Sequence, residues 1–473
     1  MSLASLWVVF RFFALSGTIL IMSIKILILL FCIFLVGCTG EKGESAATKA
    51  ETSSASTIPL PNGNTVVEPN VAKLFQKTVS SLQADKENPK LWLAHGSALF
   101  ANTYYHESAA AFRQAITLNP EMPQATYLMA TALWKVNRQE EAISEMRTAM
   151  ALIPEYDMGW RLLAEWQLER GETAKAEASA RKAFELNPAR IGTRYILAQS
   201  LMDDGKYEEA LPYLEQLTEV NKAPRWIYTL AGQCYRQLGR AQKSEEALAK
   251  AGAPFVDWPD PMYSHIPNLI AGKAELAAFA MHLYKASGPA KAKPFLVRAF
   301  KINPAHVNVR VALSIALQSE GQLDLAKKLL EKLQGEPNTN FWKQYAGICI
   351  ERKEFIEAKE HITKAIALDS KDGNAHDIAA VIEKEQGNDE DASFYWEQAG
   401  RLYSTSENWE KAELSLAFAE ENGELSPEGL QTLALAQIEL DHFMQARTTI
   451  QNLLKKDPSN EKVLELQSRL PTE

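Results

Sequence analysis

The sequence has 473 residues, of which 23% are charged, and its formal net charge is -9 at pH 7. A mildly acidic surface of this kind argues against sequence-independent binding of DNA or RNA, because such binding needs a basic patch or stripe. The length exceeds what one compact hydrophobic core usually serves, whereas a stack of repeated units has no such limit. Length alone therefore does not indicate several globular domains.

The first 38 residues have the character of an export signal rather than of a folded element. A short basic start ends at Lys25, residues 26–34 are apolar, and a box of four residues closes the segment at Cys38. This arrangement resembles the signal of bacterial lipoproteins. The resemblance implies that residues 1–37 are a signal peptide and that Cys38 becomes the acylated first residue of the mature chain.

Two alternatives stay open for this segment. Residues 1–37 contain more than the about 18 apolar residues that can span a membrane, although charged residues interrupt them. If translation starts at Met22 rather than Met1, the excess length disappears. The lipoprotein resemblance implies a lipid-anchored protein of the cell envelope, and an outer-membrane location in a Gram-negative cell, because Thr39 rather than Asp follows the cysteine.

Residues 38–66 are predicted to form a flexible tether. They are rich in Ser, Thr, Ala, Gly and Lys, so they cannot bury enough apolar surface to become ordered. A flexible chain of about 28 residues spans roughly 30 Å, which lifts the rest of the protein clear of a bilayer. Apolar residues then recur with helical spacing from Val71 to Leu82. This helix is expected to cap the exposed end of the unit that follows.

A pattern with a period of 34 residues begins at residue 89 and is marked by Pro120, Pro154 and Pro188. Three units carry the pattern in phase, at residues 89–122, 123–156 and 157–190. Positions 8, 20 and 27 of each unit hold small residues, namely Gly96, Ala130 and Ala164, then Ser108, Ala142 and Ala176, then Ala115, Ala149 and Ala183. Small residues at these positions allow two helices to touch. The pattern resembles the tetratricopeptide repeat, a helix-turn-helix unit of about 34 residues.

The resemblance implies an all-α fold, a right-handed superhelical solenoid of about ten helix pairs. Further units begin at residues 191, 225, 273, 307, 339, 393 and 427. Two interruptions are predicted, near 259–272 and near 373–392. The first contains three prolines and is expected to separate an N-terminal array (67–258) from a C-terminal array (273–470) as an open, protease-sensitive insert. In the second, two repeat frames share the helix around residue 396, and residues 373–389 are interpreted as an extra, unpaired helix.

The sequence contains no recognisable catalytic constellation. A phosphate-binding loop, a His-Glu-x-x-His motif and a Gly-x-Ser-x-Gly elbow are all missing from it. The eight histidines do not show the spacing of metal ligands. Cys234 and Cys349 are interpreted as buried packing residues rather than nucleophiles or disulfide partners. The sequence therefore predicts no enzyme, no cofactor and no metal.

Binding of a protein partner is the expected function. In the repeat family, positions 2, 5, 9, 12 and 13 of the first helices face a concave groove. The candidate groove residues are Tyr127, Thr131, Trp134, Arg161, Tyr195, Gln199, Gln233 and Arg236. Aromatic residues and arginines often contribute most to interface energy, and the two arginines favour a neutral-to-acidic peptide. An alternative interpretation is that the aromatic side chains in this set pack against neighbouring helices.

The leading hypothesis is a membrane-tethered adaptor that holds an extended segment or a helix of another envelope protein. A chaperone-like holder of exported chains and an accessory subunit of an envelope transferase system are the alternatives. The sequence does not indicate the oligomeric state or the identity of the partner.

Overall fold

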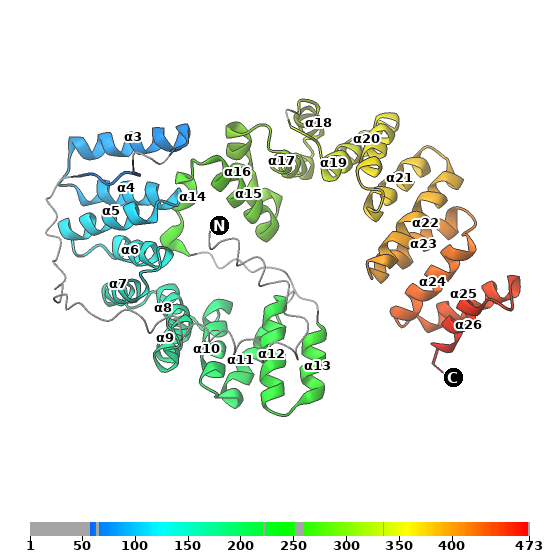
Figure 1. Cartoon of the computed structure of the whole chain (residues 1–473), viewed down its shortest axis with the longest axis horizontal. Coiled ribbons are helices and arrows are strands. Elements are labelled where there is room, and N and C mark those ends of the chain that lie inside the picture. The colour runs from blue at the N-terminus through cyan, green and yellow to red at the C-terminus, as the bar shows by residue number, and fades with distance from the viewer. Residues whose placement is uncertain (1–56, 63–65, 221–222, 251–259, 334, 472–473) are drawn as a thin grey trace, which may run out of the picture. The chain divides into compact units, whose positions relative to one another are not determined.

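The computed structural model describes residues 57–62, 66–220, 223–250, 260–333 and 335–471. The predicted signal peptide, Cys38, most of the tether and residues 251–259 lie outside these ranges. The elements of the described part are helices (Figure 1), which confirms the predicted all-α repeat fold. None of the described helices combines the length and the apolar character that crossing a bilayer requires.

Ten helix pairs that share no helix with one another occur in the described residues. The first five are α4 (Pro89–Ala101) with α5 (Tyr105–Leu118), α6 (Pro123–Lys135) with α7 (Gln139–Leu152), α8 (Asp157–Glu169) with α9 (Thr173–Leu186), α10 (Ile191–Asp203) with α11 (Tyr207–Thr218), and α12 (Arg225–Gln237) with α13 (Ala241–Ala249). The other five are α15 (Lys273–Ser287) with α16 (Pro289–Ile302), α17 (Val307–Ser319) with α18 (Leu323–Glu331), α19 (Thr339–Glu351) with α20 (Phe355–Leu368), α22 (Asp389–Thr405) with α23 (Trp409–Asn422), and α24 (Pro427–Glu439) with α25 (Phe443–Lys456).

An eleventh pair joins α21 (Gly373–Glu385) to α22, which therefore belongs to two pairs. Four further elements lie outside the pairs: α3 (Pro69–Ala84), the 3-10 helix η1 (Pro261–Tyr263), α14 (Ile266–Leu269) and α26 (Glu461–Ser468). Helix α3 packs against α4, and α26 packs against α25. Val71, Phe75 and Leu82 of α3 are buried in one cluster with Trp92 and Leu99. The two terminal helices therefore cover the apolar surfaces of the first and last pairs.

The small residues of the repeat lie where the two helices of a pair touch. Ala130, Ala142 and Ala149 are fully buried between α6 and α7. A Cβ atom added to Gly96 would lie 2.6 Å from the ring of Phe112, so this position cannot accept a larger residue without displacement. Close approach of the helices explains why the sequence pattern is strongest at positions 8, 20 and 27.

The turn between two paired helices has one recurring backbone feature, a left-handed residue at position 15; in the turn between α15 and α16 the left-handed residue is Gly288, at position 16. Position 15 is glycine in five units, at Gly171, Gly205, Gly239, Gly321 and Gly387, and another residue in five, at Thr103, Asn137, Lys353, Glu407 and Asp441. A left-handed residue ends a helix and starts the reversal of the chain. Because both Gly387 and Glu407 have this conformation, the two competing frames in the C-terminal part are both used.

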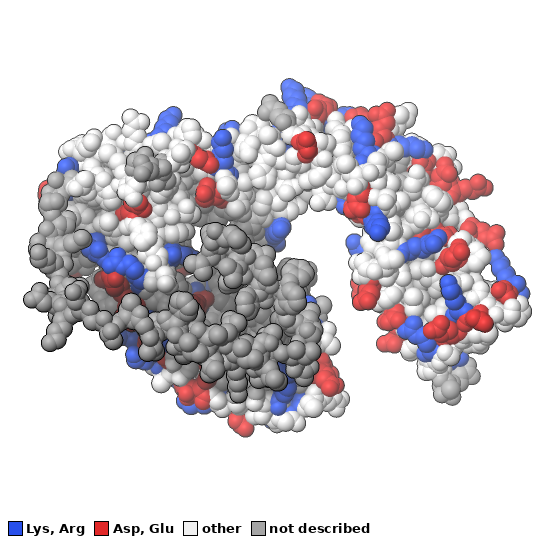
Figure 2. All heavy atoms as spheres, in the orientation of Figure 1, with Lys and Arg blue, Asp and Glu red and all other residues white. Residues whose placement is uncertain are grey.

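Within each array, successive helices also pack on each other across the boundary between units, as α5 does on α6 and α16 does on α17. Acidic and basic side chains are interspersed over the C-terminal helices on the face shown in Figure 2. Such a mixed surface agrees with the moderate net charge of the chain.

The interpretation of residues 373–389 as an unpaired helix is wrong. Helix α21 packs against both α20 and α22. Helix α22 also packs against α23, so it is the second helix of one pair and the first helix of the next. Ala392 lies in a buried cluster with Ala380 of α21, while a Cβ on Gly400 would meet Leu416 of α23. Small residues on two faces of α22 allow it to pack closely against both α21 and α23.

Candidate functional site

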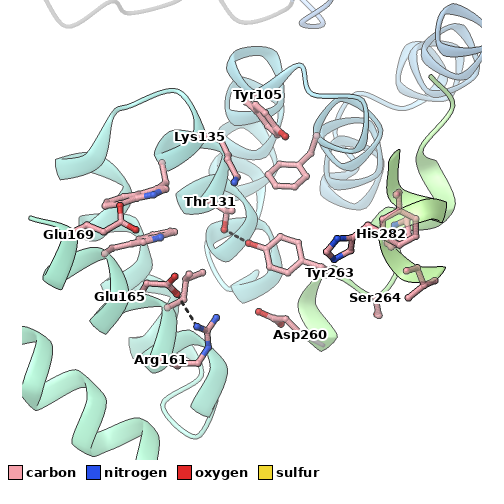
Figure 3. A pocket seen from close by; sticks show the side chains of 17 residues that line it. Tyr105, Thr131, Lys135, Arg161, Glu165, Glu169, Asp260, Tyr263, Ser264 and His282 are labelled. Carbon is pink, nitrogen blue, oxygen red and sulfur yellow. Dashed lines mark hydrogen bonds and ion pairs between the residues drawn. The ribbon is translucent and has the colours of Figure 1, made fainter. Parts of the chain in front are cut away.

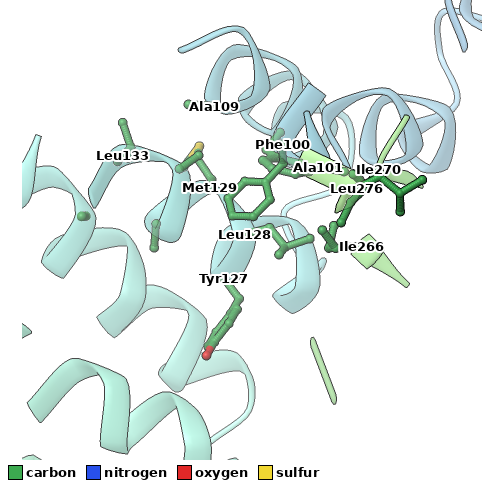
Figure 4. Packing of buried hydrophobic residues seen from close by; sticks show 14 of the residues in the cluster. Phe100, Ala101, Ala109, Tyr127, Leu128, Met129, Leu133, Ile266, Ile270 and Leu276 are labelled. Carbon is green, nitrogen blue, oxygen red and sulfur yellow. The ribbon is translucent and has the colours of Figure 1, made fainter. Parts of the chain in front are cut away.

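Residues 260–272 pack on the first helices of the N-terminal repeats instead of forming the open insert that the prolines suggest. Helix α14 contacts α4, and η1 contacts α6. Ile266 and Ile270 are buried in one cluster with Phe100 and Leu128, and Figure 4 shows these side chains together. We call residues 260–272 the docked segment.

Hydroxyl groups hold the N-terminal end of the docked segment. Tyr127 donates a hydrogen bond of 2.6 Å to one carboxylate oxygen of Asp260, and Tyr156 donates to the other oxygen. Tyr263 donates to the hydroxyl of Thr131 at 2.5 Å, and Thr131 donates in turn to the carbonyl of Tyr127 at 3.0 Å. Burial raises the pKa of Tyr127 well above its usual range. The carboxylate of Asp260 therefore has two protonated tyrosines as fixed donors.

Asn102 holds the C-terminal end of the docked segment. Its side-chain nitrogen donates to the carbonyl of Leu269 at 3.0 Å, and its oxygen accepts from the backbone nitrogens of Ala271 at 2.8 Å and Gly272 at 3.1 Å. Asn102 itself is buried. One buried side chain thus satisfies three backbone groups of the docked segment.

Polar contacts from two other sides complete the docking. His265 shares a hydrogen bond of 3.0 Å with the hydroxyl of Ser97 on α4, and burial lowers the pKa of His265. Arg298 of α16 donates to the carbonyls of Pro267 at 3.1 Å, Asn268 at 3.1 Å and Ile270 at 2.7 Å. The docked segment is therefore held by the repeats that precede it and by the pair that follows it.

A cavity of about 650 Å³ lies beside the docked segment. Its volume is within the range of ligand pockets, about 300 to 1,000 Å³. Figure 3 shows the lining side chains, which come from α4, α5, α6, α8, α15 and the docked segment itself. The aromatic members of the lining are Phe100, Tyr105, Trp134, Trp166, Tyr263 and Phe279. Trp134 and Trp166 stack with their ring centroids 4.7 Å apart and form one flat apolar wall.

The charged members of the cavity lining are three acids, Glu165, Glu169 and Asp260, and two bases, Lys135 and Arg161. Arg161 forms an ion pair of 2.8 Å with Glu165 one helical turn away. Glu169, a further turn along α8, has a pKa raised by burial and by the charge of Glu165. A smaller cavity of about 280 Å³ shares Arg161, Glu165 and Glu169 and adds Asp203 of α10. The two cavities together form a concave surface along α6, α8 and α10, which we call the acidic groove.

The structure divides the eight predicted groove residues into three groups. Tyr127 and Thr131 are buried and hold the docked segment. Trp134 and Arg161 line the larger cavity, whereas Tyr195 and Gln199 line the smaller one. Gln233 and Arg236 are exposed on α12. The sequence analysis missed Glu169 and Asp203 as site residues, although both occupy position 13, one of the positions that face the groove in this family.

Another concave surface follows α17, α19 and α21 in the C-terminal array and encloses about 550 Å³. Asn308, Asn340 and Asn374 stand at position 2 of three successive units and line it together with Lys343. Lys343 forms an ion pair of 2.6 Å with Asp372. Its apolar members, among them Met281, Val311, Ile315 and Ile378, are mostly aliphatic, so this surface lacks the stacked aromatic wall of the acidic groove.

Stacked helix pairs with a concave surface that holds a polypeptide segment define a helical-repeat scaffold. Two family models, both described as tetratricopeptide repeat, match residues 93–157 and 201–264. The chain is a tetratricopeptide repeat protein and, through these repeats, a protein-interaction scaffold.

Similar proteins share the repeats but differ greatly in length. Superkiller complex protein 3 of Homo sapiens is 25% identical over 262 residues, which cover 50% of this chain and 16% of that protein. Protein O-mannosyl-transferase TMTC3 of Homo sapiens is 24% identical over 296 residues, which cover 61% of this chain and 29% of that protein. The chain thus spans less than a third of the length of either relative.

A solved structure of a tetratricopeptide repeat protein from Parabacteroides merdae is 13% identical to the chain. The similarity covers 67% of this chain and 99% of that chain, with a TM-score of 0.29.

Proposed function

We propose that the chain is a membrane-tethered adaptor that binds a segment of a partner protein in the acidic groove. The docked segment supports this proposal, because it is a peptide of this chain held on the first helices of the repeats by backbone and side-chain contacts. The concave surface continues beyond the docked segment along Trp134, Arg161, Tyr195 and Gln199. A second polypeptide can therefore extend the same type of contact.

The charges of the acidic groove favour a basic partner rather than the neutral-to-acidic peptide expected from the sequence. That expectation assumed available arginines, but Arg161 is paired with Glu165. Glu169 and Asp203 both have pKa values raised by burial, so a cation that replaces lost water stabilises their ionised forms. A segment with one lysine or arginine next to an apolar side chain fits the carboxylates and the wall formed by Trp134 and Trp166.

Reversal of one charge tests the proposal. A photo-crosslinking residue at Gln199 should capture a stoichiometric partner from membranes, and Glu169→Lys should lower that yield about tenfold, which is about 1.4 kcal/mol. The matched control is Glu185→Lys, an exposed glutamate on the second helix α9, and it should leave the yield unchanged. If both variants capture the partner as well as the parent protein, the acidic groove is not its binding site.

Crosslinking also separates the adaptor from two alternative functions. Many unrelated products at Gln199 indicate a chaperone-like holder of exported chains. Co-purification with a transferase indicates an accessory subunit, an alternative that draws on the name of the O-mannosyl-transferase relative. The expectation that the chain itself is not an enzyme stays a prediction.

The membrane tether rests on Cys38 and has its own test. We expect the parent protein to incorporate labelled palmitate and to sediment with membranes, because two or more acyl chains are needed for stable anchoring. Cys38→Ser should abolish the label and release or mislocalise the protein. Labelling that survives this substitution contradicts a lipid anchor at Cys38.

A further inference from the structure

Three side chains with metal-binding atoms meet between α19 and α20. The sulfur of Cys349, a carboxylate oxygen of Glu357 and a ring nitrogen of His361 all lie within 4.8 Å of one another. Glu357 and His361 are one turn apart on α20, so they lie on the same face of that helix. Cys349 faces them from α19 and is fully buried, while His361 is 7% exposed. The cluster lies outside the acidic groove and has no part in the proposed function.

The imidazole of His361 has a fixed orientation. It stacks on Tyr345 with ring centroids 3.8 Å apart and on Trp342 with centroids 5.3 Å apart. Within the described residues, Nδ1 of His361 is buried without a hydrogen-bond partner. The two stacking contacts hold the ring with its other nitrogen, Nε2, toward Oε1 of Glu357.

The distance between His361 and Glu357 fits a shared cation better than a hydrogen bond. Nε2 of His361 lies 3.4 Å from Oε1 of Glu357. A hydrogen bond with one charged partner is usually about 2.7 to 2.9 Å long. Two ligands that each lie about 2.0 to 2.1 Å from a tetrahedral zinc ion are roughly 3.4 Å apart.

We propose that Cys349, Glu357 and His361 bind one Zn²⁺ ion, with a fourth position open to solvent. Thiolate, imidazole and carboxylate are the ligand types that zinc accepts in proteins. Glu357 is only half-buried, so it gives the ion a path from solvent to the buried thiol. In Zn²⁺ binding, the sulfur–hydrogen bond of Cys349 breaks, a sulfur–zinc bond forms, and the proton passes to solvent.

The charges around the cluster balance when the ion is bound. Lys327 contacts Glu354 and Glu357, both at 2.7 Å, and Arg352 contacts Glu354 and Asp324, so these five groups carry a net charge of -1. Zn²⁺ with the Cys349 thiolate carries a net charge of +1, which brings the total to zero. Lys364 and Glu360 lie near His361, and their charges act on its pKa in opposite directions. Lys327 shares Glu357 with the ion, because it bonds Oε2 and leaves Oε1 toward His361.

Titration of the full chain with a metal salt alone tests the proposal. Metal-free protein should bind one equivalent of Zn²⁺, release one proton and gain thermal stability. With Co²⁺ as the probe, a thiolate-to-cobalt charge-transfer band should appear. Cys349→Ser should abolish the band and weaken Zn²⁺ binding at least tenfold, and His361→Gln should also weaken Zn²⁺ binding at least tenfold.

Cys234→Ser is the matched control. Cys234 is the other buried cysteine of the described residues, and its thiol donates to the carbonyl of Tyr207. This variant should bind Zn²⁺ and Co²⁺ like the parent protein. If Cys349→Ser does not fold, the charge-transfer band of the parent protein and the loss in His361→Gln decide the question. Unchanged binding in both Cys349→Ser and His361→Gln, or a parent protein that gives no thiolate band, overturns the proposal.

Discussion

Replacement of Asn102 by alanine is expected to detach the docked segment and to lower the free energy of unfolding by about 3 kcal/mol, since each buried polar group that loses its partner costs about 1 to 3 kcal/mol. The variant leaves three backbone groups without their partner, the carbonyl of Leu269 and the nitrogens of Ala271 and Gly272. Urea denaturation measures the loss. Limited proteolysis should then cut residues 260–272 in the variant but not in the parent protein.

Asn119→Ala is the control for this prediction. Asn119 is half-buried, and its side chain accepts one hydrogen bond of 3.1 Å from the backbone nitrogen of Glu121. We expect a change within about 1 kcal/mol for the loss of such a local bond. Rapid cleavage of the parent protein within 260–272, or equal losses in the two variants, means that the docked segment contributes little to the folded state.

The repeats could be predicted from the sequence because their determinants are local and periodic. Small residues recur at positions 8, 20 and 27, and in the structure Ala130, Ala142 and Ala149 are fully buried. A single unit needs only its own two helices and its neighbours. Each contact therefore repeats after about 34 residues, and the period itself is visible in one sequence.

The docked segment could not be predicted in the same way. The three prolines correctly exclude a long helix at 259–272, but proline content carries no information about where a segment packs. Tyr127 contacts Asp260 from 133 positions away, and Asn102 contacts Ala271 from 169 positions away. One sequence holds no periodic signal for such pairs. The prediction placed Tyr127 and Thr131 on the concave face, which is correct, but at these residues the docked segment of the same chain covers that face.

The charge of the candidate site was misjudged for a related reason. The sequence shows which residues are arginines but not which acids they pair with. An ion pair such as Arg161 with Glu165 depends on the rotamers that the neighbouring side chains allow. The position of Glu169 one turn beyond Glu165 was visible in the sequence. A count of every charge at positions 5, 9 and 13 gives three acids, Glu165, Glu169 and Asp203, and two bases, Lys135 and Arg161, so it indicates a small acidic excess.

Helix α22 shows how two overlapping frames can both be correct. Its small residues lie on two faces, with Ala392 and Ala399 buried and Gly400 against α23. If each helix could belong to only one pair, one of the two repeat frames around residue 396 would have to be wrong. Both frames are correct because α22 packs against α21 on one side and against α23 on the other.

Two glycine-to-alanine substitutions in helices should have opposite effects on stability, and their comparison tests the packing of α22. A Cβ on Gly400 would lie 2.5 Å from Cγ of Leu416 and 3.1 Å from the carbonyl of Ala412. Leu416 is fully buried, so it cannot move aside freely. Gly400→Ala should therefore lower the free energy of unfolding by about 1 to 3 kcal/mol, the usual cost of overpacking.

Gly347 in α19 is the matched site, because a Cβ added there meets no atom within 4 Å. Alanine in the middle of a helix is more favourable than glycine by about 0.5 to 1 kcal/mol, so Gly347→Ala should raise the free energy of unfolding by that amount. Urea denaturation of the parent protein and the two variants measures both changes. If Gly400→Ala is also stabilising, α22 does not approach α23 closely and packs tightly only against α21. If both substitutions are destabilising, the cost does not come from the contact with Leu416.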